Sequence, residues 1–315
     1  YNTAVGHNSG LSVTTGVQNT LIGGLAGDAL QDADSNTAIG YNALTTDTLG
    51  SASVAIGASA LGSQNFTSAT SSYNTGVGYN AGAAITTGVQ NTLIGGLAGD
   101  ALQDADFNVA LGYNTLSTDT LGSRSVAIGY EALKTQNFTS ATESYNTVVG
   151  FHAGNDITTG IQNTLIGGLA GDALQDADFN VALGYNALST DVLGSRSTAI
   201  GRNALFTQRP VDRSGNNQAT AMNNTAIGYA AGEAVTTGLA NTFVGAGAGD
   251  NTDDGNDNTA VGRSALSGNC ADKNTAIGNS AAIACTGAKN TVLGYYAGGQ
   301  LSSGSRNIIL GCESG

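Results

Sequence analysis

A five-residue motif, Asn-Thr-Ala-Ile-Gly in its commonest form, recurs along the whole chain and restricts the folds open to it. Its final glycine marks 18 copies, from Gly6 to Gly311, and most neighbouring marker glycines are separated by the same step as Gly6 and Gly23. Longer steps follow Gly57, Gly129 and Gly201, so every fourth repeat carries an insert. A repeat this short cannot bury an apolar face alone, so stacked neighbours have to build the core together.

A second, longer period lies over the first. The stretch NTLIGGLAGDALQDAD occurs three times without change, starting at Asn19, Asn91 and Asn163. Three of the regular steps and one longer step, such as the one from Gly57 to Gly78, make up this block. We therefore expect one continuous β-solenoid over residues 1–315, divided into four blocks at 1–72, 73–144, 145–222 and 223–315.

The repeat itself predicts β-structure. The residue before the marker glycine is Val, Ile or Leu in every copy, and the residue two places earlier is usually Thr. Such a run, bounded by Asn and Gly, is typical of a strand. Because the repeat is too short for a strand and a crossover helix, which need about 30 residues, the chain is predicted to be all-β. The expected fold is a parallel β-solenoid of about 18 coils, each with two short strands and two turns.

Equivalent positions in successive copies of the repeat form columns. The residue types in each column suggest which side chains face inward. The Val/Ile/Leu column never admits a polar residue, so we expect it inside, with the Thr column on the same face. The middle column, which includes Leu21, Ala38 and Ala55, is then expected to point outward. With 47 glycines, one proline, no tryptophan and 10% charged residues, the chain has few large side chains for a wide core.

Two further columns are expected to hold the coils together. The alanine three residues after the marker glycine fits a thin core, and the marker glycine itself allows a tight bend. The asparagine column is expected to stack its amides from coil to coil as a structural ladder. That ladder includes Asn19, Asn36, Asn91, Asn108, Asn163 and Asn180.

The motifs NTAIGYNAL, SVAIGASAL and NTAVGRSAL resemble the YadA-type head repeats of trimeric autotransporter adhesins, which also occur in bacteriophage tail-fibre proteins. The resemblance covers all 18 copies and is most specific at the Asn, Ile, Gly and Ala columns. It implies a left-handed β-roll, with three chains side by side, on an extracellular fibre. The family's repeats are shorter than those of this chain, so the loops are where this chain departs from it.

An apolar outward column gives a separate reason to expect self-association. A ridge of apolar side chains along a solenoid is a large patch, and such patches mark interfaces. A closed rotational oligomer, here a homotrimer, buries the ridge. Tyrosines that follow the marker glycine are expected to pack against a neighbouring chain. They are Tyr41, Tyr79, Tyr113, Tyr130, Tyr185, Tyr229 and Tyr295.

Composition excludes several functions. The net charge of −13 argues against nucleic acid, because no basic stripe is present to neutralise phosphates. No apolar run is long enough to insert into a membrane. Two histidines in unrelated repeats, His7 and His152, leave no catalytic triad to assemble, and GRSAL is not a convincing nucleophile elbow. We expect no enzyme, no catalytic residue and no cofactor.

A glycine-rich motif, an acidic cluster and the Thr column each have a simpler explanation than a functional site. GGLAGD lacks the Lys and Ser/Thr of a phosphate loop and the βαβ setting of a dinucleotide site. The cluster of Asp100, Asp104 and Asp106 recurs once per block, so its copies do not stack, and we interpret them as polar turns rather than metal ligands. The Thr column could order water as in ice-binding solenoids, but an inward Thr column would not reach ice.

Two sets of residues remain as candidate sites. Partner contacts are expected at the inserts, because loops on rigid scaffolds carry function. Those residues are Gln64, Asn65, Phe66, Gln136, Asn137, Phe138, Arg209, Pro210 and Arg213. Cys270 and Cys285 occupy nearly the same place on consecutive coils, and stacked strands lie within disulfide reach, so a bridge or a close thiol pair is expected.

The sequence thus predicts a non-enzymatic structural and adhesive fibre shaft outside the cell. The favoured setting is a phage tail fibre or virion fibre that holds receptor-binding regions away from the particle, with a host receptor or glycan as partner. The alternatives are a bacterial trimeric adhesin head, a polysaccharide-degrading tailspike and an ice-binding solenoid. Released oligosaccharides would favour the tailspike, and thermal hysteresis the ice-binding solenoid.

Overall fold

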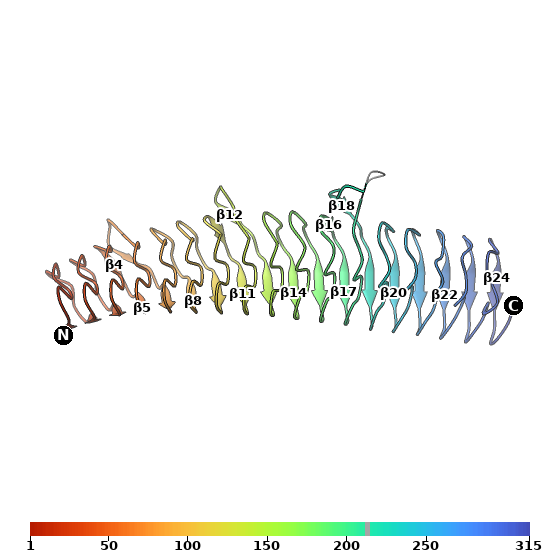
Figure 1. The fold of residues 1–315 in the computed structure, drawn as a ribbon, viewed down its shortest axis with the longest axis horizontal. Helices are drawn as coiled ribbons and strands as arrows, with labels where there is room; N and C mark the ends of the chain where they lie inside the picture. Colours follow the sequence, from red (N-terminus) through yellow and green to blue (C-terminus); the bar gives the residue numbers. More distant parts are fainter. Residues whose placement is uncertain (212–214) are drawn as a thin grey trace. The chain divides into compact units, whose positions relative to one another are not determined.

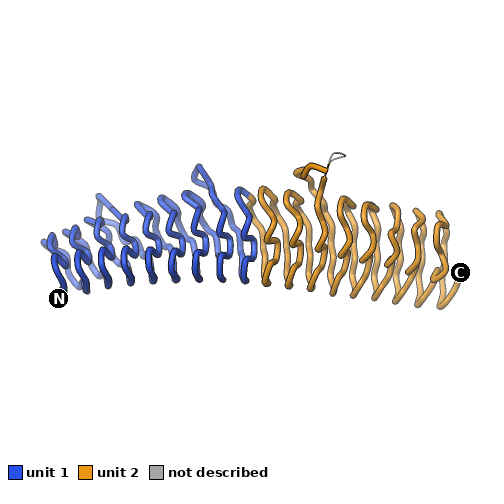
Figure 2. The backbone as a smooth tube through the Cα atoms, in the orientation of Figure 1, with its two compact units in different colours: residues 1–159 blue, residues 160–315 orange. Residues whose placement is uncertain are grey.

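The computed structural model describes residues 1–211 and 215–315, so Arg213 lies outside the described residues. Within these ranges every regular element is a β-strand, and no helix is present that could cross a membrane. The chain is a parallel β-solenoid, as the sequence predicts, and Figure 1 shows its strands repeating once per turn. It divides into two compact units, residues 1–159 and 160–315 (Figure 2).

Each unit contains nine strands of three residues, one per turn. In unit 1 they are β1 (Thr3–Val5), β2 (Thr20–Ile22), β3 (Thr37–Ile39), β5 (Val54–Ile56), β7 (Thr75–Val77), β8 (Thr92–Ile94), β9 (Val109–Leu111), β11 (Val126–Ile128) and β13 (Thr147–Val149). In unit 2 they are β14 (Thr164–Ile166), β15 (Val181–Leu183), β17 (Thr198–Ile200), β19 (Thr225–Ile227), β20 (Thr242–Val244), β21 (Thr259–Val261), β22 (Thr275–Ile277), β23 (Thr291–Leu293) and β24 (Ile308–Leu310).

The expected second strand of each turn is present only at the inserts. There, pairs of two-residue strands form three small parallel sheets. They are β4 (Gly50–Ser51) with β6 (Thr70–Ser71), β10 (Gly122–Ser123) with β12 (Thr142–Glu143), and β16 (Gly194–Ser195) with β18 (Thr220–Ala221). In the other described coils this side consists of turns and bends without a regular strand.

The strands pair in parallel and in register with their copies in the next turn. β2 pairs with β3 so that Thr20 lies opposite Thr37 and Ile22 opposite Ile39. Equivalent residues therefore form straight columns within each unit. This register makes each column of the repeat a row of side chains on one face.

The predicted direction of these columns is wrong by one residue. The middle residue of each strand is inside: Leu21 is 1% exposed, and Ala38 and Ala55 are fully buried. The Val/Ile/Leu column faces outward, with Ile22 at 38% and Leu111 at 41% exposure. A shift of one residue moves every side chain of a strand to the other face, and an apolar column on both faces left the sequence ambiguous.

The core is thin, and in many turns a large residue at one position stands with a small residue at another. Where the middle strand residue is Leu21, the residue four places after the marker glycine is Gly27; where it is Ala38, that residue is Leu44. A Cβ on Gly27 would lie only 2.8 Å from Leu21 and Leu30 carbons. In these two turns large and small residues thus alternate across the core, as close packing requires.

The marker glycines are required by the backbone. Gly95 has a φ of 138°, and a Cβ there would lie 2.2 Å from the carbonyl oxygen of Gly112 in the next turn. No other residue fits such a close approach of two backbones. The bend expected from the sequence is therefore present at the marker glycines.

The buried asparagine column links successive turns, but mainly through the backbone. Asn19 Oδ1 accepts from the backbone N–H of Asn36 at 2.9 Å, and Asn19 Nδ2 donates to the carbonyl of Ala33 at 2.7 Å. Asn91, Asn108 and Asn180 repeat this pattern. Amide-to-amide bonds, the expected form of the ladder, are secondary, as between Asn91 Nδ2 and Asn74 Oδ1 at 3.3 Å.

Candidate functional site

Each unit has an uncharged outer strand face, which we define as the Thr column together with the Val/Ile/Leu column. In unit 1 the second column consists of Val5, Ile22, Ile39, Ile56, Val77, Ile94, Leu111, Ile128 and Val149. In unit 2 it consists of Ile166, Leu183, Ile200, Ile227, Val244, Val261, Ile277, Leu293 and Leu310. Neither column contains a charged residue, and apolar rows of this kind mark interfaces.

The Thr column lies on this outer face and not inside. Thr20 and Thr37, for example, are half-buried, so the expectation of an inward Thr column is wrong. The reason is the same as for the Val/Ile/Leu column: the strand faces are exchanged by a shift of one residue. The row is broken by Val54, Val109 and Val126 in unit 1. Hydroxyl and methyl groups therefore share a flat surface with the larger aliphatic side chains.

The inserts turn their most distinctive side chains inward. Gln64 and Phe66 of the first insert are 0% and 5% exposed, and Gln136 and Phe138 of the second are 0% and 6% exposed. These four side chains are buried in the single chain, and the partner contacts expected at the inserts stay a prediction. Backbone hydrogen bonds also hold the first insert: Leu49 N donates to Phe66 O at 3.1 Å, and Asn65 N donates to Thr86 O at 2.9 Å.

A buried carboxylate clasps each of these inserts. Asp47 Oδ1 accepts from the backbone N–H groups of Gly50 and Phe66, both at 3.0 Å. Its Oδ2 accepts from Gln64 Nε2 at 2.5 Å. Asp119 makes the same three bonds in the second block, to Gly122, Phe138 and Gln136. Hydrogen bonds to a carboxylate in this setting are charge-assisted and strong.

The clasp also repairs an interruption in the asparagine column. Serine replaces asparagine at Ser53, one turn before the insert returns to the column at Asn74. Gln64 spans this gap: its Nε2 donates to Ser53 Oγ at 2.8 Å, and its Oε1 accepts from Asn74 Nδ2 at 2.9 Å. The signal was visible in the sequence, because Asp47 and Gln64 stand in a column occupied by Leu30 and Ile85 in neighbouring turns.

The third insert has a weaker clasp. Pro210 replaces the phenylalanine of the other inserts, and proline has no N–H to give to Asp191. The remaining bonds come from Gly194 N at 2.7 Å and Gln208 Nε2 at 2.5 Å. Burial raises the pKa of Asp191 from its usual 3.8 to about 6, against the opposing effect of these hydrogen bonds.

This raised pKa predicts a pH-dependent stability in unit 2. The folded state binds the Asp191 proton more tightly than the unfolded state, so its stabilising effect is complete below pH 3.8 and disappears as the pH rises through about 6. We expect the free energy of unfolding to fall by about 2–3 kcal/mol across this window from Asp191 alone. Urea unfolding of the parent and of Asp191→Asn gives the free energy of unfolding of each between pH 4 and 7.5. The difference between the two slopes against pH is the contribution of Asp191.

A second variant separates the proline from the burial. Pro210→Phe restores the residue of the other inserts and its N–H, so we expect the pKa of Asp191 to fall and the pH dependence to shrink. If the free energy of unfolding changed with pH in the same way in the parent, Asp191→Asn and Pro210→Phe, the role given to Asp191 would be contradicted. An unchanged Asp191 pKa in Pro210→Phe would contradict the part assigned to the missing N–H.

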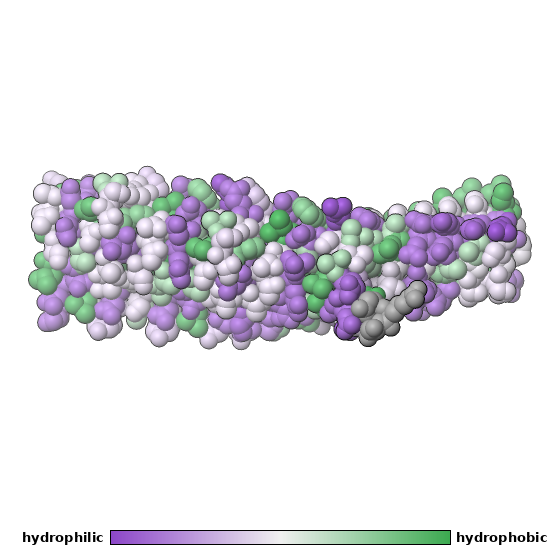
Figure 3. Space-filling model, turned by 90° about the horizontal axis from the view of Figure 1, so that it is seen from above, coloured by the Kyte–Doolittle hydropathy of each residue, from purple (hydrophilic) through white to green (hydrophobic). Residues whose placement is uncertain are grey.

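The remaining described insert residues differ in exposure. Asn137 is exposed, and its Oδ1 accepts from Thr120 Oγ1 at 3.1 Å, while Asn65 is half-buried. Arg209 is exposed and its Nε donates to Asn217 Oδ1 at 2.8 Å, whereas Pro210 is buried. On the face that Figure 3 draws, apolar residues are scattered among hydrophilic ones.

The aromatic column after the marker glycine stacks within the chain. The rings of Tyr113 and Tyr130 lie 5.7 Å apart, and those of Tyr130 and Phe151 lie 5.6 Å apart, all three exposed. In unit 2, the Arg202 guanidinium lies 6.0 Å from the Tyr185 ring and 5.8 Å from the Tyr229 ring. The role of these tyrosines toward a neighbouring chain stays a prediction.

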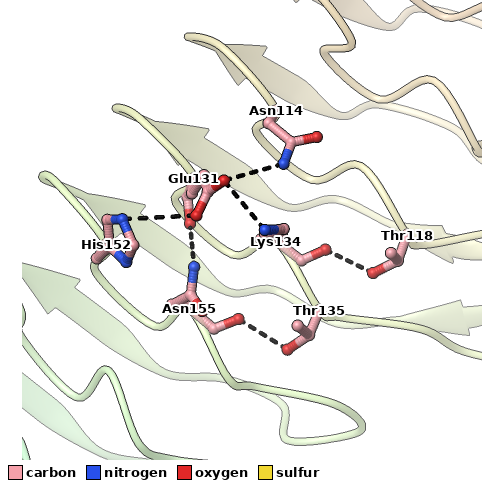
Figure 4. A network of polar contacts seen from close by, with 7 residues as sticks. All are labelled: Asn114, Thr118, Glu131, Lys134, Thr135, His152 and Asn155. Atoms are coloured by element: carbon pink, nitrogen blue, oxygen red, sulfur yellow. Dashed lines mark hydrogen bonds and ion pairs between the residues drawn. The ribbon is translucent and has the colours of Figure 1, made fainter.

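Beside the aromatic stack lies a small ionic network, shown in Figure 4. Glu131 Oε1 accepts from Lys134 Nζ at 3.0 Å and from Asn114 Nδ2 at 3.2 Å, and Glu131 Oε2 is 3.5 Å from His152 Nε2. The hydrogen bond from Lys134 is the main reason that the pKa of Glu131 lies below its usual value. Its partners hold this carboxylate ionised, so it is unsuited to act as a general acid at neutral pH.

The acidic turns bind the neighbouring turn. Asp104 Oδ1 accepts from Thr87 Oγ1 at 2.8 Å, and Asp106 Oδ1 accepts from the backbone N–H of Val89 at 2.7 Å. Within residues 1–211 and 215–315, no three acidic, histidine or cysteine side chains converge as metal ligands. These aspartates therefore act in the described structure as links between turns.

Cys270 and Cys285 are buried and lie close together as free thiols. Cys270 Sγ is 2.9 Å from the carbonyl oxygen of Cys285. The hydrogen bond from the Cys270 thiol lowers the pKa of Cys285, which favours the thiolate needed for oxidation. The expected disulfide between them stays a prediction.

We expect oxidised protein to hide both buried cysteines from alkylation until a reductant is added. Mass spectrometry after labelling measures this, with exposed Cys312 as the internal control that is labelled in either case. Unfolded, non-reduced protein in which Cys270 and Cys285 are both alkylated would rule out the bridge.

No protein-family model matches the chain, and no curated protein matches it.

Proposed function

We propose that this chain is a non-enzymatic segment of an extracellular structural and adhesive fibre that assembles side by side with copies of itself. The outer strand face carries this proposal. Its two columns contain no charged side chain over nine turns in each unit, and members such as Ile22 and Leu111 are about two-fifths exposed. A partner that covers both columns removes this apolar surface from water.

Three identical chains around one axis are the favoured assembly. The in-register columns repeat the same surface at every turn, so a copy that fits one turn fits the next. Rotational symmetry closes such a contact without leaving a sticky edge. The resemblance of the repeats to YadA-type heads supports a trimer, either in a phage or virion fibre or in a bacterial adhesin; the flanking sequence distinguishes these two settings.

Sedimentation equilibrium of the chain tests the assembly. We expect a mass three times the 31.1 kDa of one chain, at protein concentrations in the micromolar range. A single-chain mass over this range would refute the proposal, because the outer strand face would then be stable in water.

Ice binding is a second candidate, favoured by one observation: the Thr column faces outward. A flat row of threonine hydroxyl and methyl groups can order water, although Val54, Val109 and Val126 interrupt it in unit 1. Thermal hysteresis and ice-crystal shaping measure this activity. Their absence in single chains would remove the candidate.

A further inference from the structure

We propose that two matching grooves, beside the second and third inserts, bind neutral saccharides. The inference deepens the proposed function, because it rests on an exposed fibre and names the ligand class and its site. Groove A lies in unit 1 and groove B in unit 2. The residues that line the two grooves are not the insert side chains that the sequence predicted as contacts, which are largely buried.

Groove A, of about 390 Å³, lies between the acidic turn 104–107 and the short insert strand β12. Asp104, Asp106, Ser123 and Thr142 are among the residues that line it. Phe107 is 39% exposed, with the Arg124 guanidinium 4.7 Å from its ring centre. Arg124 Nε donates to Glu143 at 3.0 Å, which fixes the guanidinium beside the groove.

Groove B repeats this arrangement in about 340 Å³. Asp176, Asp178 and Phe179 stand where the first groove has its acidic turn, and Arg196 lies 5.8 Å from the Phe179 ring. Asp178 N donates to Ser195 Oγ at 2.9 Å, the same bond that Asp106 makes to Ser123. Ala221 replaces the glutamate, and among the described residues Arg196 has no acidic partner.

The chemistry of these linings fits a polyol. The carboxylates accept hydrogen bonds from hydroxyl groups, the guanidinium donates to ring and hydroxyl oxygens, and the phenylalanine offers an apolar surface for the C–H face of a sugar. Acidic groups outnumber the arginine in both grooves. This excess negative charge disfavours uronic, sialic and sulfated sugars, so neutral saccharides are the expected ligands.

The first block provides a natural comparison. It keeps the same framework: Asp34 Oδ1 accepts from Val17 N at 2.7 Å, and Asp34 N donates to Ser51 Oγ at 2.9 Å. However, Ser35 stands in place of the phenylalanine and Ala52 in place of the arginine. Each substitution that exchanges these residues between blocks therefore introduces a side chain already present at the equivalent position of another block.

The test uses the full chain in native electrophoresis through gels that contain one polysaccharide each. Neutral probes are hydroxyethyl cellulose, laminarin, galactomannan and glycogen; acidic probes are polygalacturonate and dextran sulfate. We expect at least one neutral probe to retard the parent chain and neither acidic probe to do so. Retention by no probe, or preferential retention by an acidic one, overturns the proposal.

Variants locate the binding. Phe107→Ser/Arg124→Ala and Phe179→Ser/Arg196→Ala each weaken the retardation, and the fourfold variant loses about tenfold or more in affinity for the retarding probe. Ser35→Phe/Ala52→Arg gains a third groove and is retarded more strongly. A fourfold variant that binds like the parent overturns the site.

Sedimentation of the same samples separates the two proposals. An assembled parent chain without saccharide binding overturns the grooves and leaves the fibre proposal intact. A chain that binds saccharide through the grooves but remains single overturns the fibre assembly alone.

Discussion

Asn91→Ala is expected to lower the free energy of unfolding of unit 1 by about 2–6 kcal/mol, because it leaves buried polar groups without partners. Asn91 is fully buried; its Oδ1 accepts from Asn108 N at 2.9 Å and its Nδ2 donates to Ala105 O at 2.7 Å. Alanine leaves this N–H and this carbonyl unpaired, and each such group costs about 1–3 kcal/mol. Urea unfolding followed by circular dichroism measures the change.

Gln90→Ala is the matched control. Gln90 is the adjacent residue, it is exposed, and alanine already occupies the equivalent position at Ala52 with the same positive φ. An exposed side chain of this kind should change stability by no more than about 0.5 kcal/mol. Equal unfolding midpoints for the two variants would show that the asparagine column does not stabilise the solenoid.

The double variant Ile94→Lys/Leu111→Lys is expected to convert the assembled protein to single chains while leaving each chain folded. Both side chains point outward from adjacent strands, at 36% and 41% exposure. A single chain keeps the new ammonium groups in water. In an assembly around one axis, like charges would meet in a water-poor interface, which costs several kcal/mol per buried ion.

Gln90→Lys/Gln103→Lys makes the same change in charge at two exposed residues outside β8 and β9. We expect this control to sediment as the parent does. Circular dichroism of both variants checks that the chains are folded. If the outer-face variant retains the parent's mass, another surface holds the copies together and the outer strand face is not the interface.

Several features of the fold could be predicted from spacing alone. The turn length, the parallel register and the need for glycine at the marker positions all follow from a short motif that repeats at a nearly constant step. The blocks also indicated where inserts occur. These features follow from the periodicity of the chain, because the same motif recurs in every turn.

The candidate sites were less accessible to sequence reasoning. Gln64 was expected to contact a partner because it lies in an insert, yet its amide accepts from Asn74 Nδ2 and continues the asparagine column. The signal was its place in a column otherwise held by Leu30 and Ile85. The grooves depend on Phe107 and Arg124, which come from different turns and meet only once the turns are stacked.

What the sequence by itself determined is the solenoid: a short constant period, in-register turns and three inserts. What only the tertiary structure decided is which way each column points. Strand alternation assigns Thr20 and Ile22 to one face and Leu21 to the other, but both faces are rich in apolar residues. Only the structure shows that the middle residue of each strand faces the core, where Leu21 packs beside Gly27 and where Ala38 and Leu44 are both buried.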